Sequence, residues 1–530
     1  MTESGDTLSA PSAARGSKRE VYTVMSGLMV AMLLAMLDNM VVGTAMPTIV
    51  GELGGLTHLA WVVTAYTLAT AVSTPVWGKL GDLYGRKGVF MAAIVLFLIG
   101  SALAGMSQSM SQLITFRGVQ GLGAGGLIVS AMAIIGDLVP PRERGRYQGM
   151  MAAVMPLAMI GGPLLGGLCT DHLGWRWAFF VNLPLGALAL LVTALTMHLP
   201  RWRASHRVDY PGVVLLTAGV SALILLATWG GTEYAWGSPT IIGLGAGSLV
   251  SLTAFVLWET RAAEPIVPMR LFRNANFSLA SALGFLVGFA MFGAVTFLPL
   301  YQQLVQGASA TGSGLLLLPL LTGMLITLIV VGQLITRTGR YRVYPIAGGV
   351  VMTAGMLLLA QLTTGTSRLT TSLFMVVLGV GMGFLMQNTM LIAQNSVEMK
   401  DLGAASGAAT LFRTLGGSLG VSLLGAIYGN QLTDELTTRL GAKGAELSAG
   451  GTQLTPQLLE RLPEGVRVAF THAVTSGVHG VFVWAAGFAA VAFAVALFIR
   501  DVPLRGGPVE VPATGDDDAV AEAAPSPVGA

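Results

Sequence analysis

Charged residues and cysteine are both scarce in this chain of 530 residues. Lys, Arg, Asp and Glu together make up 10% of the sequence, whereas a soluble domain carries about 25%. The one cysteine, Cys169, excludes an intrachain disulfide and a metal site built from cysteines. The basic residues are scattered through short connections rather than gathered in one patch, so we do not expect nucleic acid as a partner.

Signatures of catalysis and of nucleotide binding are also missing. The sequence has no GxxxxGK[ST] phosphate loop, no HExxH helix and no GxSxG turn in a setting that suits a nucleophile. No apolar stretch with a cleavage site precedes the first long apolar run, so we expect no cleaved signal peptide. We therefore predict that the protein is not an enzyme, holds no metal or cofactor, and is not driven by ATP.

Apolar residues are abundant, and their distribution predicts a polytopic membrane protein. Hydrophobic residues make up 53% of the chain, and the mean hydropathy is +0.72. Long apolar runs require helices, because helices satisfy their own backbone groups in lipid. Fourteen such runs predict an all-α membrane protein with fourteen transmembrane helices: 24–46, 60–78, 88–107, 113–136, 147–169, 177–198, 210–229, 239–258, 277–300, 313–336, 343–362, 370–394, 404–428 and 476–499.

The basic residues predict the orientation in the membrane. Both terminal tails and the even-numbered connections hold 21 of the 29 Lys and Arg residues. Four of the remaining eight basic residues lie in the long connection 429–475. Because cytoplasmic loops carry an excess of Lys and Arg, we expect a multi-pass protein of the cytoplasmic (inner) membrane with both termini in the cytoplasm.

An internal repeat predicts the architecture. A shift of 258 residues places seven glycines of the first half on seven of the second: Gly121, Gly123, Gly125, Gly145, Gly149, Gly162 and Gly167 on Gly379, Gly381, Gly383, Gly403, Gly407, Gly420 and Gly425. An even number of helices separates the copies, so both begin on the same side of the membrane. A parallel repeat of this kind relates the two six-helix halves of many secondary transporters.

This repeat divides the chain into two six-helix bundles and a middle segment with two extra helices. The latter part of the outside loop, Leu458 to His472, could form an amphipathic helix that leads into the last span. The predicted parts are a cytoplasmic tail 1–23, an N-terminal bundle 24–198, a linker 199–276 with the two extra helices, a C-terminal bundle 277–500 with an outside loop 429–475, and a disordered tail 501–530.

A lone carboxylate, Asp38, lies inside the apolar run from Val24 to Met46. Placing a carboxylate there costs at least ~2.5 kcal/mol, so a chain that keeps one has a use for it. Asp38 could carry a proton or pair with a cation, or it could form a structural ion pair with Arg117. The depths of Asp38 and Arg117 in their helices differ by only ~5 Å at 1.5 Å per residue, so direct contact is possible. Gln120 lies one turn beyond Arg117 and could complete a polar cluster.

The connection 78–90 reads GKLGDLYGRKGVF. Asp82 could meet Arg86 or the N-terminus of a helix from the other half. The string resembles motif A of the major facilitator superfamily, which implies a latch between the halves in the outward-facing state. The matching residues are Gly78, Asp82, Gly85, Arg86 and Lys87. A worn second copy, GQLITRTGR at 332–340, has Thr336 in place of the aspartate, so only the first latch should carry charge; alternatively, 78–90 is an ordinary basic loop.

Two further strings resemble motifs B and C of the same superfamily. LITFRGVQGLGAGG at 113–126 resembles motif B, whose arginine is implicated in proton transfer. Arg117 itself keeps its proton near neutral pH, so we expect it to favour the charged form of a nearby carboxylate; the alternative is that it only satisfies backbone carbonyls. AMIGGPLLGG at 158–167 resembles the antiporter motif C, with Ala158 in place of the first glycine, or it is a general packing face. Its matching residues are Gly162, Pro163, Gly166 and Gly167.

The branch of the family is indicated by LDNMVVGTAMP at 37–47 and GWRWAFFVNLPLG at 174–186. Both resemble the fourteen-helix drug/proton antiporters of the QacA/EmrB type, with departures at Met40 and Gly43. The resemblance implies a monomer that works in membrane lipid and exports amphipathic toxic small molecules, such as drugs, antibiotics and cationic dyes, in exchange for protons. The alternative is a dedicated exporter of one native metabolite, such as a self-made antibiotic, a siderophore or a lipid. With Asp38 as the one acidic residue deep in the membrane, we expect substrates that are neutral or singly charged cations.

Overall fold

The computed structural model describes residues 18–53, 59–152, 154–197, 208–231, 233–308, 310–441 and 463–503. These residues are helical and contain no β-strand. The N-terminal half consists of α1 (Lys18–Leu53), α2 (Leu59–Tyr84), α3 (Arg86–Gly105), α4 (Met110–Leu138), α5 (Pro141–Ala152), α6 (Val154–Leu168), the π-helical turn η2 (Cys169–Leu173), α7 (Trp177–Phe180) and α8 (Asn182–Thr196).

The middle segment and the C-terminal half follow the same helical plan. The middle segment contains α9 (Tyr210–Trp229), α10 (Pro239–Glu259) and the 3₁₀ turn η3 (Met269–Arg273). The C-terminal half consists of α11 (Ala275–Leu304), α12 (Ala310–Leu315), α13 (Leu318–Thr338), α14 (Val343–Ala360), α15 (Arg368–Asn395), the turn η4 (Met399–Asp401), α16 (Leu402–Leu440) and α19 (Glu464–Leu497).

Each of the fourteen predicted spans falls on helix. Within the described residues, twelve helical segments are long and apolar enough to cross a membrane. The predicted spans 60–78 and 147–169 are not among those twelve: the first lies in α2, and the second runs through α5 and α6, which have 12 and 15 residues. The predicted all-α membrane fold is confirmed.

Three predicted boundaries fall within helices. Helix α1 already begins at Lys18, inside the predicted tail 1–23. Helix α16 continues to Leu440 and α19 begins at Glu464, so both ends of the predicted outside loop 429–475 are helical. Polar residues flank the apolar runs at these places, and a helix that projects beyond the hydrocarbon can carry them. The rest of that loop, 442–462, and the tail from 504 onward lie outside the described residues.

The glycine repeat corresponds to equivalent packing in the two halves. Gly121 of α4 lies against the Tyr66 carbonyl of α2, and Gly379 of α15 lies against the Leu320 carbonyl of α13. At both positions a methyl group would come within 2.4 Å or less of that carbonyl oxygen, so only glycine permits the approach. The two six-helix halves are therefore built on the same close helix crossings.

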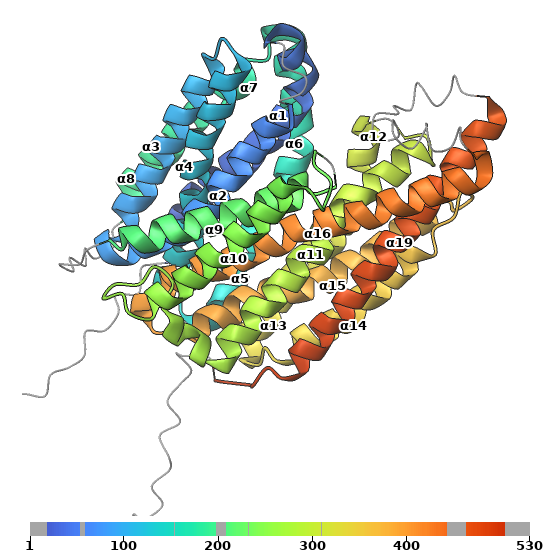
Figure 1. The fold of residues 1–530 in the computed structure, drawn as a ribbon. Helices are drawn as coiled ribbons and strands as arrows, with labels where there is room; N and C mark the ends of the chain where they lie inside the picture. Colours follow the sequence, from blue (N-terminus) through green and yellow to red (C-terminus); the bar gives the residue numbers. More distant parts are fainter. Residues whose placement is uncertain are drawn as a thin grey trace, which may run out of the picture.

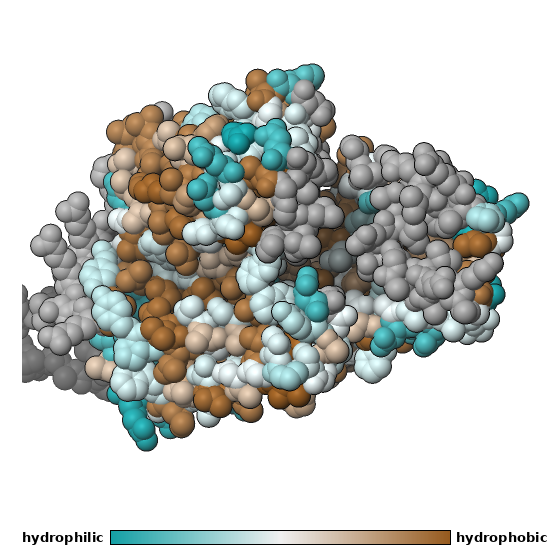
Figure 2. Space-filling model, turned by 45° about the horizontal axis from the view of Figure 1, so that its top comes forward, coloured by the Kyte–Doolittle hydropathy of each residue, from teal (hydrophilic) through white to brown (hydrophobic). Residues whose placement is uncertain are grey.

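The two bundles meet at one end and diverge at the other (Figure 1). At the closed end α2 packs against α16, and α5 packs against α13. Helix α9 packs against α10, α2 and α16, so the extra pair flanks the junction of the bundles. Figure 2 looks toward the open end and shows a hollow between the two halves. We call these the closed end and the open end below.

Candidate functional site

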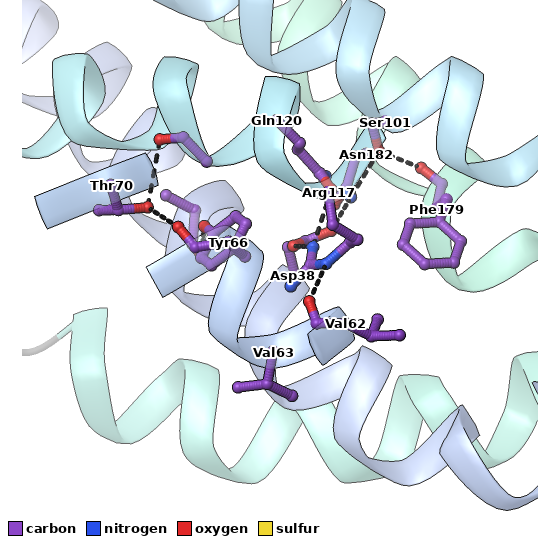
Figure 3. Close-up of polar contacts among 12 residues, drawn as sticks. Asp38, Val62, Val63, Tyr66, Thr70, Ser101, Arg117, Gln120, Phe179 and Asn182 are labelled. Carbon is purple, nitrogen blue, oxygen red and sulfur yellow. Dashed lines mark hydrogen bonds and ion pairs between the residues drawn. The ribbon is translucent and has the colours of Figure 1, made fainter. Parts of the chain in front are cut away.

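The lone carboxylate of α1 is paired with the arginine of α4. Arg117 Nη1 donates a short hydrogen bond to Asp38 Oδ2 (Figure 3), and neither side chain has any exposed surface. Burying a lone charge in lipid is expensive, whereas two opposite charges in contact compensate each other. The two residues that the sequence placed at similar depth are therefore brought together, in the interior of the N-terminal bundle.

Two amide side chains complete the shell of the carboxylate. Gln120 Nε2 donates to Asp38 Oδ1 at 2.8 Å, and Asn182 Nδ2 of α8 donates to the same oxygen at 2.7 Å. Gln120 Oε1 in turn accepts from Arg117 Nη1 at 2.7 Å. Asn182 also donates to Ser101 Oγ of α3 at 2.9 Å. Arg117, Gln120 and Asn182 all donate to Asp38, so the arrangement fits a charged carboxylate.

The guanidinium of Arg117 also contacts α2. Its Nε donates to the Val62 carbonyl at 3.4 Å, and its Cζ lies 4.1 Å from the centroid of the Tyr66 ring. Tyr66 is held in place because its hydroxyl donates to the Ala35 carbonyl of α1 at 2.9 Å. The charge cluster thus ties together α1, α2, α4 and α8 (Figure 3). A proton on Asp38 would remove the partner of Arg117 at the point where these four helices meet.

The predicted latch connects the two bundles at the closed end. Both carboxylate oxygens of Asp82 accept backbone hydrogen bonds at the start of α16, from Gly403 N at 3.0 Å and from Ala404 N at 2.9 Å. A carboxylate in this position satisfies the free N–H groups of the helix and interacts favourably with its dipole. Gly78 and Gly403 meet face to face, because a methyl group on either would come within 2.4 Å of the other's carbonyl oxygen.

The remaining latch residues hold Asp82 in place. Arg86 Nη2 lies 3.0 Å from Asp82 Oδ1, and Arg86 Nε pairs with Asp137 at the end of α4. Gly85 has a φ of 91°, a conformation that favours glycine and allows the tight turn into α3. Lys87 Nζ donates to the Ala194 carbonyl of α8 at 2.8 Å. Both partners considered for Asp82 from the sequence, Arg86 and a helix N-terminus of the other half, are present together.

The worn second copy makes no equivalent contact. The Thr336 hydroxyl donates to the Gly332 carbonyl of its own helix at 2.8 Å. Gly339 ends α13 with a φ of 70°, so the turn is retained although the carboxylate is not. A charged tie of this kind between a motif copy and the opposite bundle is therefore seen at Asp82 and not at Thr336.

One glycine of α6, Gly162, packs closely against the first helix. A methyl group on Gly162 would lie 2.2 Å from Met40 Cβ of α1, whereas a methyl group on Gly167 would meet nothing within 4 Å. Gly166 lies on the same helix, and its carbonyl accepts a hydrogen bond from the Thr170 hydroxyl at 2.5 Å. Pro163 lies in α6, and its side chain is outside the described residues. Close packing of α6 on the helix that bears Asp38 links this glycine face to the charge cluster.

Sequence reasoning missed three members of the cluster: Asn182, Ser101 and Tyr66. Asn182 had a signal in the sequence, because it is an amide within the apolar string 174–186. Hydropathy alone cannot show that it faces Asp38, since that depends on the rotation of α8 about its axis. Within the described residues, no three His, Cys, Asp or Glu side chains are grouped as they would be to hold a metal ion.

Comparisons with known proteins give consistent results. A family profile described as the Major Facilitator Superfamily matches residues 28–421. An uncharacterized MFS-type transporter of Mycobacterium tuberculosis is 42% identical over 485 residues, which cover 91% of this chain and 70% of the relative. The multidrug transporter protein MdtP of Bacillus subtilis is 37% identical over 519 residues, covering 93% of this chain and 96% of that protein. Among solved structures, the human organic anion transporter MFSD10 has a TM-score of 0.62 at 13% identity and covers 91% of this chain and 100% of its own, a likeness that shows the fold.

Proposed function

Because this chain belongs to the major facilitator superfamily, and is thus a membrane transporter and not an enzyme, we propose that it exports amphipathic small molecules in exchange for protons. A relative named as a multidrug transporter, aligned over nearly the full length of both chains, supports the broad class of substrate. The chain contains both bundles, so one copy provides a complete transport path, and we propose that it works as a monomer.

We propose that the closed end faces the cytoplasm. The connections at this end carry most of the Lys and Arg residues, including those of the latch. Both termini then lie in the cytoplasm, and the membrane is the cytoplasmic (inner) membrane. In this orientation the hollow of Figure 2 opens outward, and Asp82 holds the cytoplasmic side shut.

The observation that carries proton coupling is the charge cluster at Asp38. In the outward-open conformation the charged carboxylate has three side-chain donors and no exposed surface. Protonation would make Asp38 a neutral carboxylic acid, with one oxygen turned from an acceptor into a hydroxyl donor. Arg117 would then have no counter-charge in a low-dielectric interior. A ligand shifts a conformational equilibrium only when it binds the two states differently, and a proton on Asp38 meets this requirement. We propose that proton uptake weakens this conformation and so drives the change to the inward-open one.

The test is dye transport driven by a pH gradient in proteoliposomes that contain the full chain. Vesicles with an imposed pH gradient are loaded with a panel of acidic, neutral and cationic amphipathic dyes. The proposal predicts that at least one dye moves against its own gradient only while the pH gradient is present, and that Asp38→Asn abolishes this movement. Glu52→Gln is the matched control, because Glu52 is a half-exposed carboxylate at the end of the same helix. Dye movement that is unaffected by the pH gradient, or by Asp38→Asn, would refute proton coupling.

A further inference from the structure

A second arginine lies deep in the membrane, in the C-terminal bundle. Arg413 is in α16, ten residues beyond Gly403, whose N–H is capped by Asp82 at the closed end. At 1.5 Å per residue it lies ~15 Å into the helix, close to the middle of a hydrocarbon layer ~30 Å thick. A charged side chain at this depth is rare and marks a functional position unless it has a structural partner.

Arg413 has no such partner among the described residues. Among those residues, no ion pair and no hydrogen bond joins its guanidinium to a neighbour. This is the opposite of Arg117, which has a carboxylate, an amide, a carbonyl and an aromatic ring around it. One turn before Arg413, the hydroxyl of Thr410 is buried and has no hydrogen-bond partner among the residues that the structure describes. Residues three apart share a helix face, so two unsatisfied polar groups lie on one side of α16.

The position of Arg413 along α16 places it between the closed end and the open end. The crossing of α2 and α16 is marked by Gly403 against Gly78 and by Gly407 against Pro75. Helix α16 continues from this crossing toward the open end (Figure 1), and Arg413 lies six residues beyond Gly407 on that helix. The side chain is half-buried rather than sealed.

Gly288 of α11 makes room for the arginine. A methyl group on Gly288 would lie 3.2 Å from Arg413 Cγ and 2.1 Å from the Arg413 carbonyl oxygen. The stem of Arg413 therefore runs along α11, and its charged end has no hydrogen-bond or ion-pair partner in the described part of the chain. A guanidinium facing hydrocarbon in this state would be uncompensated, whereas a water-filled hollow solvates it until a ligand arrives.

We propose that Arg413 is the anion-recognition point of the transport path, and that the exported molecules are amphipathic compounds with a carboxylate. The planar guanidinium presents paired N–H donors that match the two oxygens of a carboxylate. This inference rests on the proposed export function and narrows its substrate class. It reverses the charge expected from the sequence, because Asp38 is enclosed in the N-terminal bundle and the free charge at the hollow is positive.

The test measures binding to the purified full chain with three matched fluorescent probes: 1-pyrenebutyrate, its carboxamide, and a pyrenebutyl trimethylammonium ion. Wild-type protein is expected to bind the carboxylate about tenfold or more tightly than the carboxamide, as a charge-assisted pair implies. Arg413→Gln is expected to abolish this preference while leaving carboxamide binding unchanged, and Arg413→Lys is expected to keep part of it. Arg439→Gln is the matched control, since Arg439 is exposed on the same helix and pairs with Glu435.

Each result then supports or overturns the proposal. Equal affinity of wild type for the carboxylate and the carboxamide, or an unchanged preference in Arg413→Gln, overturns it. Size-exclusion profiles of all variants show that the fold is kept, and Arg413→Lys supplies the answer if Arg413→Gln does not fold. Loss of carboxylate binding on addition of phosphatidylglycerol would show that the anion held is a lipid phosphate and would overturn substrate recognition. In proteoliposomes, pH-driven movement of the cationic or neutral probe alone would overturn this inference and leave the export function standing, whereas movement of no probe would count against the export function itself.

Discussion

Replacing Asp38 by asparagine separates a structural from a proton-carrying role when it is combined with a change at Arg117. Asparagine has nearly the same shape, but it offers one acceptor oxygen where the carboxylate serves three donors. Arg117 would then be a buried cation without a counter-charge. Breaking a fully buried ion pair in this way costs about 3–5 kcal/mol, and the oxygen kept by asparagine places the expected loss near ~3 kcal/mol.

The double variant Asp38→Asn with Arg117→Gln removes both charges together. A buried pair replaced as a unit is often nearly neutral for stability, so most of the loss in the single variant should be recovered. Thermal unfolding of the purified variants in one detergent measures this recovery. Transport driven by a pH gradient should be absent from both variants, because neither has a group at position 38 that binds and releases a proton. Recovery of pH-driven transport together with stability in the double variant would refute the proton-carrying role and leave Asp38 as a structural partner.

The other expectations concern the latch, the glycine face of α6 and the driving force. Asp82→Asn should impair transport and shift the chain toward the inward-open state, seen as increased labelling from the cytoplasmic side, whereas Thr336→Ala should leave both near wild type; equal effects would contradict the asymmetry between the copies. Gly162→Ala should lower thermal stability by about 1–3 kcal/mol because the added methyl overlaps Met40 Cβ, while Gly167→Ala, which meets nothing, should not; equal shifts in unfolding temperature would count against this packing. Exchange of a carboxylate for one proton moves two charges, so an inside-negative potential of 100 mV should favour export by roughly 4.6 kcal/mol, and a rate in proteoliposomes that does not respond to valinomycin-imposed potentials would argue against an anionic substrate.

The helices and the central ion pair could be predicted from the sequence because both depend on how far along a membrane-spanning helix a residue lies. An apolar run of sufficient length defines a span, and the rise per residue gives the depth of each charge within it. Asp38 and Arg117 were matched by depth alone, and they are in contact. Asn182 could not be assigned to the cluster in the same way, because its contact depends on how α8 is rotated and on which helices are neighbours.

The ends of the helices and the role of the second arginine needed the structure for different reasons. Hydropathy marks where a chain leaves the hydrocarbon and not where its helix ends, so the extension of α16 to Leu440 was not visible in the sequence. Arg413 is plain in the sequence as a charge within a span. Its importance lies in the lack of a partner among the described residues, and that can be judged only when its neighbours are known.

The charge cluster and the latch are connected through the contact between α4 and α2. Directly after Gln120, the carbonyl of Gly121 accepts from Thr70 at 3.1 Å, and the carbonyl of Leu122 accepts from Trp77 Nε1 at 2.7 Å. These bonds fix α2 to the helix that holds Arg117, and α2 carries Asp82 at its end. A shift of α4 that follows loss of the Asp38 pair must therefore move α2 or break these bonds. Moving α2 would pull the Asp82 carboxylate from the start of α16, because that contact depends on two hydrogen bonds of 2.9 and 3.0 Å. The proton uptake that we propose at Asp38 would in this way release the closed end, with no need for the proton itself to reach the latch.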